Sequence, residues 1–154
     1  MKKLLRARDI LLLTLAGIGD VAQEIKDAPR QGGALVYGFV GDLGSGKTTF
    51  VKLLGKELGV KREITSPSFL IMRPYETGFK NFPHLIHIDA YRLKSSDELA
   101  RLGFQELLDD SHNLIIVEWA NNVRNIMPKD AHWIRFEHGE MEGERKIKLK
   151  NAEV

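Results

Sequence analysis

Residues 41–48, Gly-Asp-Leu-Gly-Ser-Gly-Lys-Thr, follow the pattern G-x-x-x-x-G-K-T, which limits the possible folds more than any other feature of the chain. The pattern is typical of a phosphate-binding loop between a buried strand and a helix. Its glycines allow a tight turn that brings backbone N–H groups close to phosphate oxygens. The lysine ammonium can reach the β- and γ-phosphates, and the threonine hydroxyl can ligate Mg²⁺. The residues expected to contact nucleotide are Asp42, Leu43, Gly44, Ser45, Gly46, Lys47, Thr48 and Thr49.

The sequence on either side of this loop supplies the setting that the pattern requires. Residues 34–40 form a short apolar run that predicts a buried strand, and residues 48–58 carry apolar side chains at helical spacing. A helix that begins at Gly46 would point the positive end of its dipole at a bound phosphate. The alternative, a glycine-rich turn with a surface lysine, does not account for this strand–loop–helix order.

Composition limits the class of protein. The 154 residues are enough for one domain, and we predict a single P-loop ATPase domain over residues 1–154. The chain has no cysteine, which excludes disulfides and thiolate metal sites and is consistent with a reducing cytoplasm. The net charge of +2, from 23 basic and 21 acidic residues, argues against a protein that coats nucleic acid.

The N-terminus superficially resembles a signal peptide, because basic residues precede the apolar run 10–19. That run is too short to span a bilayer, and no clear small-residue cleavage site follows it. We therefore expect a strand or helix that covers the sheet, in a cytoplasmic protein without a membrane-spanning segment.

The remaining pattern predicts a P-loop NTPase-like, three-layer α/β fold with a mainly parallel sheet. A helix is expected to begin at Ser95 and to run through Leu99, Leu102, Leu107 and Leu108 on one apolar face. The other expected elements are strands over residues 70–75, 85–89 and 114–118, and an antiparallel C-terminal hairpin of residues 131–137 and 145–150.

Two of the expected strands end in an acid, Asp89 and Glu118. Strand carboxyl ends converge at the ligand crevice of such sheets, and P-loop enzymes commonly hold Mg²⁺ with an acid at that position. We therefore predict a metal site formed by Thr48, Asp89 and Glu118, in which either acid could ligate the ion directly. An acid after a strand can also be a helix cap or a surface residue. His87 alternates with apolar residues and is assigned to the core. The segment 65–69 is either a nucleotide-sensitive switch loop or an ordinary turn.

Four segments of the chain follow one another in a distinctive order. They are residues 41–49, Ser66-Pro67-Ser68-Phe69, His87-Ile88-Asp89-Ala90-Tyr91-Arg92-Leu93 and Val117-Glu118-Trp119. Together they resemble the TsaE family, formerly YjeE, of small bacterial ATPases in tRNA threonylcarbamoyladenosine biosynthesis. A fifth similarity, Asp97-Glu98-Leu99 with Leu102-Gly103-Phe104, resembles a helix of the same family.

The resemblance implies an ATPase that uses Mg²⁺, binds ATP or ADP and works with TsaD-like and TsaB-like partners, so that tRNA is contacted only through the complex. It implies that Thr48 and Glu118 ligate Mg²⁺ and that Asp89 is the Walker-B-like acid. It also implies that Trp119 lies beside the site and that Thr14, on an N-terminal helix, approaches the nucleotide. The expected catalytic residues are Lys47, Asp89 and Glu118.

Other functions share the P-loop. A small-molecule kinase would need a second-substrate pocket and a lid with an arginine, and no lid-like insertion is evident. A GTPase-like switch would carry an Asn-Lys-x-Asp guanine-binding motif, which the sequence lacks. A module that holds nucleotide without turnover also remains open, and hydrolysis assays distinguish it from an ATPase.

Overall fold

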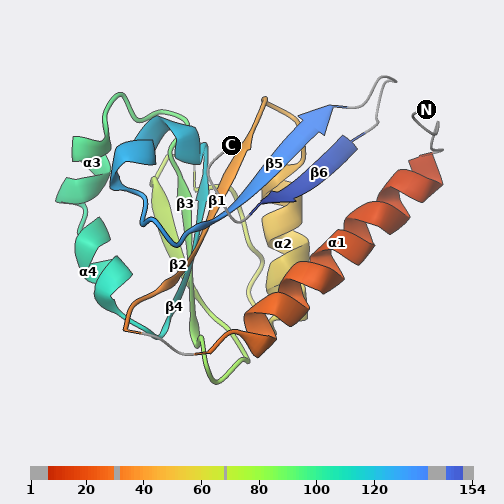
Figure 1. The fold of residues 1–154 in the computed structure, drawn as a ribbon, viewed down its shortest axis with the longest axis horizontal. Coiled ribbons are helices and arrows are strands. Elements are labelled where there is room, and N and C mark those ends of the chain that lie inside the picture. The colour runs from red at the N-terminus through yellow and green to blue at the C-terminus, as the bar shows by residue number, and fades with distance from the viewer. Residues whose placement is uncertain (1–6, 30–31, 68, 139–144, 151–154) are drawn as a thin grey trace.

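A six-stranded sheet forms the centre of the protein, with the strand order β2-β3-β4-β1-β5-β6 (Figure 1). The computed structural model describes residues 7–29, 32–67, 69–138 and 145–150; the side chains of 7–16, and those of 145–150 other than Ile147, are outside the description. The central strands are parallel, and each edge strand is antiparallel to its neighbour. The strands are β1 (Leu35–Gly41), β2 (Met72–Glu76), β3 (His84–Asp89), β4 (Asn113–Glu118), β5 (His132–His138) and β6 (Arg145–Lys150).

Helices cover both faces of this sheet, which gives the three layers expected from the sequence (Figure 1). Helices α1 (Ala7–Asp27) and α2 (Lys47–Glu57) pack on one face. Helices α3 (Ser96–Arg101), α4 (Phe104–Asp109) and the 3₁₀ helix η1 (Ala120–Ile126) pack on the other. The predicted α/β fold class, including the antiparallel C-terminal hairpin of β5 and β6, is confirmed.

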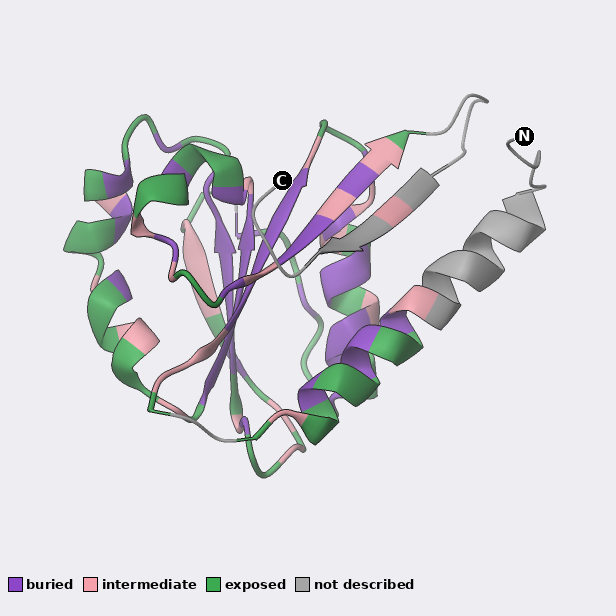
Figure 2. Ribbon diagram, in the orientation of Figure 1, coloured by how far each residue is buried: buried purple, intermediate pink, exposed green. Residues whose placement is uncertain are grey.

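The strands serve both cores because successive side chains point to opposite faces of the sheet. In β1, Tyr37 and Phe39 join the core under α1 and α2, whereas Val36 and Val40 join the other core. Figure 2 shows the central strands buried along most of their length. Such strands are apolar without alternation, as their sequence indicates.

The helix expected from Ser95 through Leu108 is instead two short helices, so this prediction is wrong. Gly103 separates α3 from α4 and adopts a φ of 88°, a left-handed conformation that ends a helix and favours glycine. The chain turns at this point, which buries Phe104 and leaves Leu102 49% exposed. The leucine spacing indicated helix correctly but did not reveal the break.

The N-terminal segment forms a helix, one of the two forms expected. Helix α1 lies against α2 and buries Ile18, Val21, Ala22 and Ile25, whose spacing places them on one helical face. Within the described part of the chain, no helix combines the length and the apolarity that crossing a bilayer requires.

Strand register brings the predicted acids to one edge of the sheet. Asp89 lies opposite Glu118 in the β3–β4 pair, and Glu118 lies opposite Phe39 in the β4–β1 pair. Because β1 leads directly into the glycine-rich loop, the loop and both carboxylates lie at the carboxyl ends of neighbouring parallel strands. This is the edge at which sheets of this class bind ligands.

Candidate functional site

The loop between β1 and α2 has the backbone geometry that its glycines predict. Gly41, Gly44 and Gly46 have φ angles of 151°, 74° and 102°, which side chains of L-residues rarely tolerate. At Gly41 there is also no space, because a Cβ would lie 2.4 Å from the carbonyl oxygen of Phe136. The chain then enters α2 at Lys47, whose first-turn N–H groups and positive dipole end favour an anion.

Lys47 lies inside this loop rather than on its surface. Its Nζ donates to the carbonyl oxygens of Gly41 at 2.6 Å and Asp42 at 2.8 Å, and to Ser45 Oγ at 3.2 Å. Only 5% of the residue is exposed, so Lys47 is buried within the loop.

The charge on Lys47 is balanced by its surroundings. Burial lowers the pKa of Lys47 below its ordinary value, while the carboxylates of Glu118, Asp42 and Asp89 oppose that shift. The ammonium also lies 4.3 Å from the ring centroid of Trp119. All three hydrogen bonds of the Lys47 ammonium go to uncharged oxygens. Its positive charge is therefore not neutralised by a direct ion pair in these bonds, as binding of a phosphate requires.

Thr48 and Glu118 meet across the sheet edge. The Thr48 hydroxyl donates to Glu118 Oε1 at 2.8 Å, although the residues are 70 positions apart in the sequence. Glu118 is 2% exposed and Asp89 is 7% exposed, so both acids are buried. Asp89 Oδ1 accepts a hydrogen bond from the backbone N–H of Tyr91 at 3.0 Å.

His87 joins this cluster, which the sequence reasoning missed. The residue is fully buried, as expected of a core histidine, but its Nε2 lies 2.5 Å from Glu118 Oε2. Glu118 thus has one carboxylate oxygen on Thr48 and the other on His87. The alternation in β3 predicts burial alone and gives no sign of a partner on another strand.

The backbone is unusual at two positions beside the cluster. Trp119, directly after Glu118, has a φ of 56°, and Ile71, directly before β2, has a φ of 66°. Left-handed conformations are unfavourable for such bulky residues and often occur at functional sites. Trp119 packs against Tyr91 with ring centroids 4.9 Å apart, so this conformation positions its indole between Tyr91 and Lys47.

The glycine-rich loop, Asp89, Glu118 and Trp119 line one cavity of about 320 Å³. Of the predicted nucleotide contacts, Asp42 lies in the loop but does not line the cavity, and the side chain of Thr14 in α1 is outside the described residues. Tyr91 and Arg92 line it without having been predicted as contacts. The cavity is lined by Leu43, Gly44, Ser45, Gly46, Lys47, Thr48, Thr49, Ser66, Asp89, Tyr91, Arg92, Glu118 and Trp119.

Of the described residues in the segment 65–69, Ser66 lines this cavity. The Thr65 hydroxyl accepts a hydrogen bond from Arg73 at 2.9 Å, and Pro67 is buried. Phe69 is 84% exposed, although the Arg92 guanidinium lies 4.6 Å from its ring centroid. Ser68 is outside the described residues.

The chemistry of the site suits a hard cation that is shared with phosphate. Among the described residues, no group of three or more His, Cys, Asp or Glu could hold a metal ion. Thr48, Glu118 and Asp89 instead offer oxygen donors on one side of the cavity, the donor type that Mg²⁺ prefers. Mg²⁺ commonly takes its remaining ligands from water and substrate phosphates, so this donor set fits the ion.

Comparison with known proteins gives consistent matches. The sequence model of the family described as "Threonylcarbamoyl adenosine biosynthesis protein TsaE" matches residues 14–147. The chain is 40% identical over 95 residues to the tRNA threonylcarbamoyladenosine biosynthesis protein TsaE of Borreliella burgdorferi, covering 62% of this chain and 66% of that protein. It is 39% identical over 90 residues to the protein of the same name from Bacillus subtilis, covering 58% and 53%.

The aligned part therefore spans less than two thirds of the length of these relatives. Among solved structures, the crystal structure of Bacillus subtilis YdiB matches with a TM-score of 0.67 and 25% identity. That match covers 97% of this chain and 83% of the YdiB chain.

Proposed function

The chain belongs to the TsaE family, and from this premise we propose that it binds and hydrolyses Mg²⁺–ATP in support of tRNA threonylcarbamoyladenosine synthesis. The observation that carries the proposal is the convergence of Lys47, Thr48, Asp89 and Glu118 on one cavity beside the amino end of α2. A cation, a hydroxyl and two carboxylates at a phosphate-binding loop are the groups that phosphoryl transfer uses.

Each residue has a distinct role in this proposal. Lys47 and the loop N–H groups hold the β- and γ-phosphates, and Mg²⁺, when bound, neutralises charge on the phosphate oxygens. Thr48 and Glu118 are the expected ligands on the protein side, because their oxygens are already 2.8 Å apart. Asp89 is the second carboxylate, which either completes the metal shell or orients the attacking water.

His87 and Trp119 are assigned positioning roles. His87 fixes the second oxygen of Glu118, so the carboxylate does not rotate away from Thr48. Trp119 covers Lys47 and excludes water from one side of the ammonium. Both residues therefore act through the groups that contact the nucleotide.

The proposed partners are TsaD-like and TsaB-like proteins, with tRNA contacted through the complex rather than by this chain alone. The names of the relatives place them in this biosynthesis, and the balanced net charge of +2 is consistent with weak RNA binding. We expect hydrolysis to be slow in isolation and faster with the partners present.

Single-turnover hydrolysis of ATP, with and without purified TsaB-like and TsaD-like proteins, tests the proposal. We expect Mg²⁺-dependent phosphate release that the partners accelerate. Glu118→Gln should slow this release by about tenfold or more, and the exposed control Glu57→Gln should retain it. Nucleotide binding without release under any condition would instead favour a binding module. Transfer of the γ-phosphate to a small acceptor in place of water would favour a kinase.

A further inference from the structure

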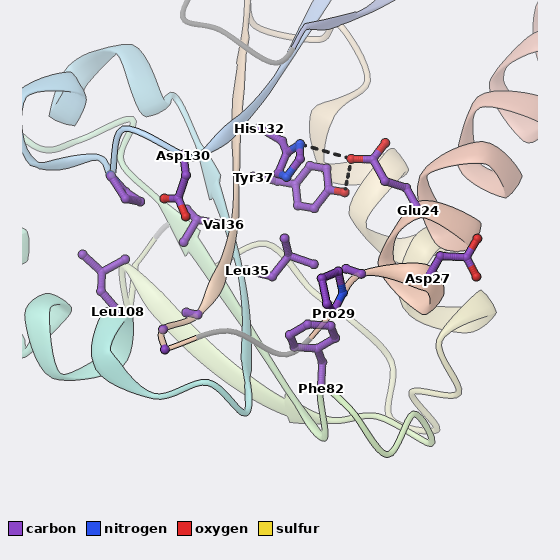
Figure 3. Close-up of a pocket in the computed structure, with 15 residues that line it drawn as sticks. Glu24, Asp27, Pro29, Leu35, Val36, Tyr37, Phe82, Leu108, Asp130 and His132 are labelled. Carbon is purple, nitrogen blue, oxygen red and sulfur yellow. Dashed lines mark hydrogen bonds and ion pairs between the residues drawn. The ribbon is translucent and has the colours of Figure 1, made fainter.

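A second cavity, of about 860 Å³, lies at the amino ends of the parallel strands (Figure 3). It opens where β1 begins, whereas the phosphate-binding loop follows the last residue of β1. Its lining comes from the end of α1, the segments before β1, β3 and β5, and the end of α4. Tyr37, the last residue of β1 that lines this cavity, is four positions from Gly41, about 13 Å at roughly 3.3 Å per residue.

One wall of this cavity is a fixed polar network. Tyr37 is 2% exposed, and its hydroxyl donates to Glu24 Oε1 at 2.9 Å. The same carboxylate oxygen lies 3.1 Å from His132 Nδ1, and the Tyr37 and His132 rings stack with centroids 5.0 Å apart (Figure 3). Two groups of the sheet therefore hold the Glu24 carboxylate in place at the cavity rim.

The remaining lining combines an apolar floor with further negative charge. Asp27 follows Glu24 on α1, and Asp130 lies on the far side of the cavity in the segment before β5 (Figure 3). Asp130 makes no hydrogen bond or ion pair with any other described residue. No described lining residue is a lysine or arginine. The apolar floor includes Pro29, Leu35, Val36, Phe82 and Leu108.

We propose that this cavity binds an arginine side chain, together with its apolar neighbours, from an extended segment of a partner protein. A guanidinium matches the carboxylates at the rim, because its planar donors pair with carboxylate oxygens, and it stacks on the partly exposed ring of His132. Adjacent apolar side chains would cover Pro29, Leu35 and Leu108, which are not fully buried. An arginine anchor in an apolar pocket is a common feature of protein interfaces.

The site is independent of the proposed ATPase function, since none of its lining residues belongs to the nucleotide cavity. The two proposals can therefore fail separately. A variant at the cavity is expected to leave ATP binding unchanged, and Lys47→Ala is expected to leave peptide binding unchanged.

The test uses the full chain and the peptide acetyl-Leu-Arg-Leu-amide, with amide chemical shifts followed by NMR. The matched peptide acetyl-Leu-citrulline-Leu-amide keeps the shape and removes the charge. We expect saturable shifts around Leu35, Tyr37 and Phe82 with the arginine peptide, and weaker binding of the citrulline peptide. Equal affinity for both peptides, or shifts confined to other regions, would overturn the proposal.

Three acidic variants refine the test. Glu24→Gln and Asp130→Asn should each weaken binding about twofold to fivefold, in the range of a partly exposed ion pair. Asp20→Asn, an exposed acid on α1 outside the cavity, should leave binding unchanged. If Asp20→Asn weakens binding as much as Asp130→Asn, only the overall charge matters and the proposed site is wrong. Asp130→Asn keeps the test valid should Glu24→Gln loosen α1.

A final variant tests whether the chain supplies its own cation. Arg30 follows Pro29 in the sequence and is outside the described residues. We expect Arg30→Ala to leave the affinity for acetyl-Leu-Arg-Leu-amide within twofold. Binding that occurs only after this substitution would mean that the protein occupies its own cavity, and it would overturn the proposal of a partner segment.

Discussion

Charged side chains are buried at the carboxyl ends of the parallel strands, whereas at the amino ends the acids stay at the rim of a wider cavity. Lys47, Asp89 and Glu118 are each less than a tenth exposed, while the Glu24 side chain is 44% exposed. The carboxyl-end cavity is also the smaller, at about 320 Å³ against 860 Å³. Cavity volume alone would therefore select the end of the sheet that lies opposite the glycine-rich loop.

The two ends also differ in backbone strain. Trp119 and Ile71, the two described non-glycine residues with positive φ, both lie beside the carboxyl-end site. Buried ionisable groups and strained backbone both cost stability, so their coincidence indicates a functional site. Among the described residues that line the amino-end cavity, no side-chain-bearing residue has a positive φ, and the buried ionisable group, Tyr37, is a neutral hydrogen-bond donor.

The largest expected effect comes from Lys47→Ala. Removing the ammonium leaves phosphate charge at the loop without a lysine partner, so we expect ATP affinity to fall roughly 10²-fold. Isothermal calorimetry against the control Lys52→Ala, an exposed lysine on α2, measures this. Because Lys47 also hydrogen-bonds the loop, circular dichroism must show an intact fold. A folded variant with unchanged ATP affinity would contradict the assignment of this end.

The next effect concerns the two acids. Loss of either carboxylate disturbs the metal shell more than the nucleotide itself, so Glu118→Gln and Asp89→Asn should slow hydrolysis by about tenfold or more. ADP affinity should change much less. If both variants hydrolyse ATP at the parent rate and with the parent Mg²⁺ requirement, these two buried acids have only a structural role.

The sequence predicts those features of the two ends that consecutive residues encode, and it does not predict those that form only when distant segments pack together. The loop is predictable because eight consecutive residues encode both its turn and its chemistry. Asp89 and Glu118 follow from the end positions of two apolar strands, since parallel strands share one carboxyl edge. In contrast, the amino-end cavity collects residues from segments between Glu24 and His132, and no local pattern marks it.

Two further features depend on tertiary contacts. The break at Gly103 is invisible in the leucine spacing, because a glycine inside a helix costs only about 1 kcal/mol and packing decides whether the chain turns. The partner of His87 lies 31 residues away on β4, so the sequence predicts its burial but not its contact. The family resemblance implies that Thr14 approaches the nucleotide, and the side chain of this residue is outside the described part.

A third prediction measures the cost of burial at the carboxyl end. His87→Ala leaves Glu118 Oε2 without its closest partner, so the free energy of unfolding should fall by about 1–3 kcal/mol. Urea denaturation measures this, with the exposed His112→Ala as a control that should have little effect. The double variant His87→Ala/Glu118→Gln should recover part of the loss. If the free energy of unfolding does not fall in His87→Ala, the contact with His87 does not hold the Glu118 carboxylate in place.

A fourth prediction asks whether the two ends respond differently to nucleotide. Phosphate contacts can order a loop and hydrolysis can release it, so residues 62–70 should be better protected from hydrogen exchange with an ATP analogue than with ADP when the partners are present. Ser66→Ala and Pro67→Ala should reduce partner-stimulated hydrolysis more than ATP affinity. Identical protection in both states would leave the segment an ordinary turn. Amides at the start of β1 should not respond in either case.

The smallest effect is expected at the amino end. The pKa of Tyr37 is raised above its ordinary value of 10.0, mainly by burial and secondly by the nearby Glu24 carboxylate. The Tyr37 hydroxyl therefore remains a neutral donor in the folded protein. Tyr37→Phe removes this donor and should lower the free energy of unfolding by about 1 kcal/mol, without changing ATP affinity.

The pH dependence identifies the source of that small loss. The unfolded chain ionises its tyrosine near the ordinary pKa and the folded protein does not, so the parent loses stability as pH rises above about 10. Phenylalanine has no such ionisation, and the stability difference between parent and Tyr37→Phe should be constant below that pH and shrink above it. Denaturation curves across this range provide the measurement. A difference that stays constant throughout would mean that Tyr37 has the same pKa in the folded and unfolded protein, which would contradict the burial of its hydroxyl against Glu24.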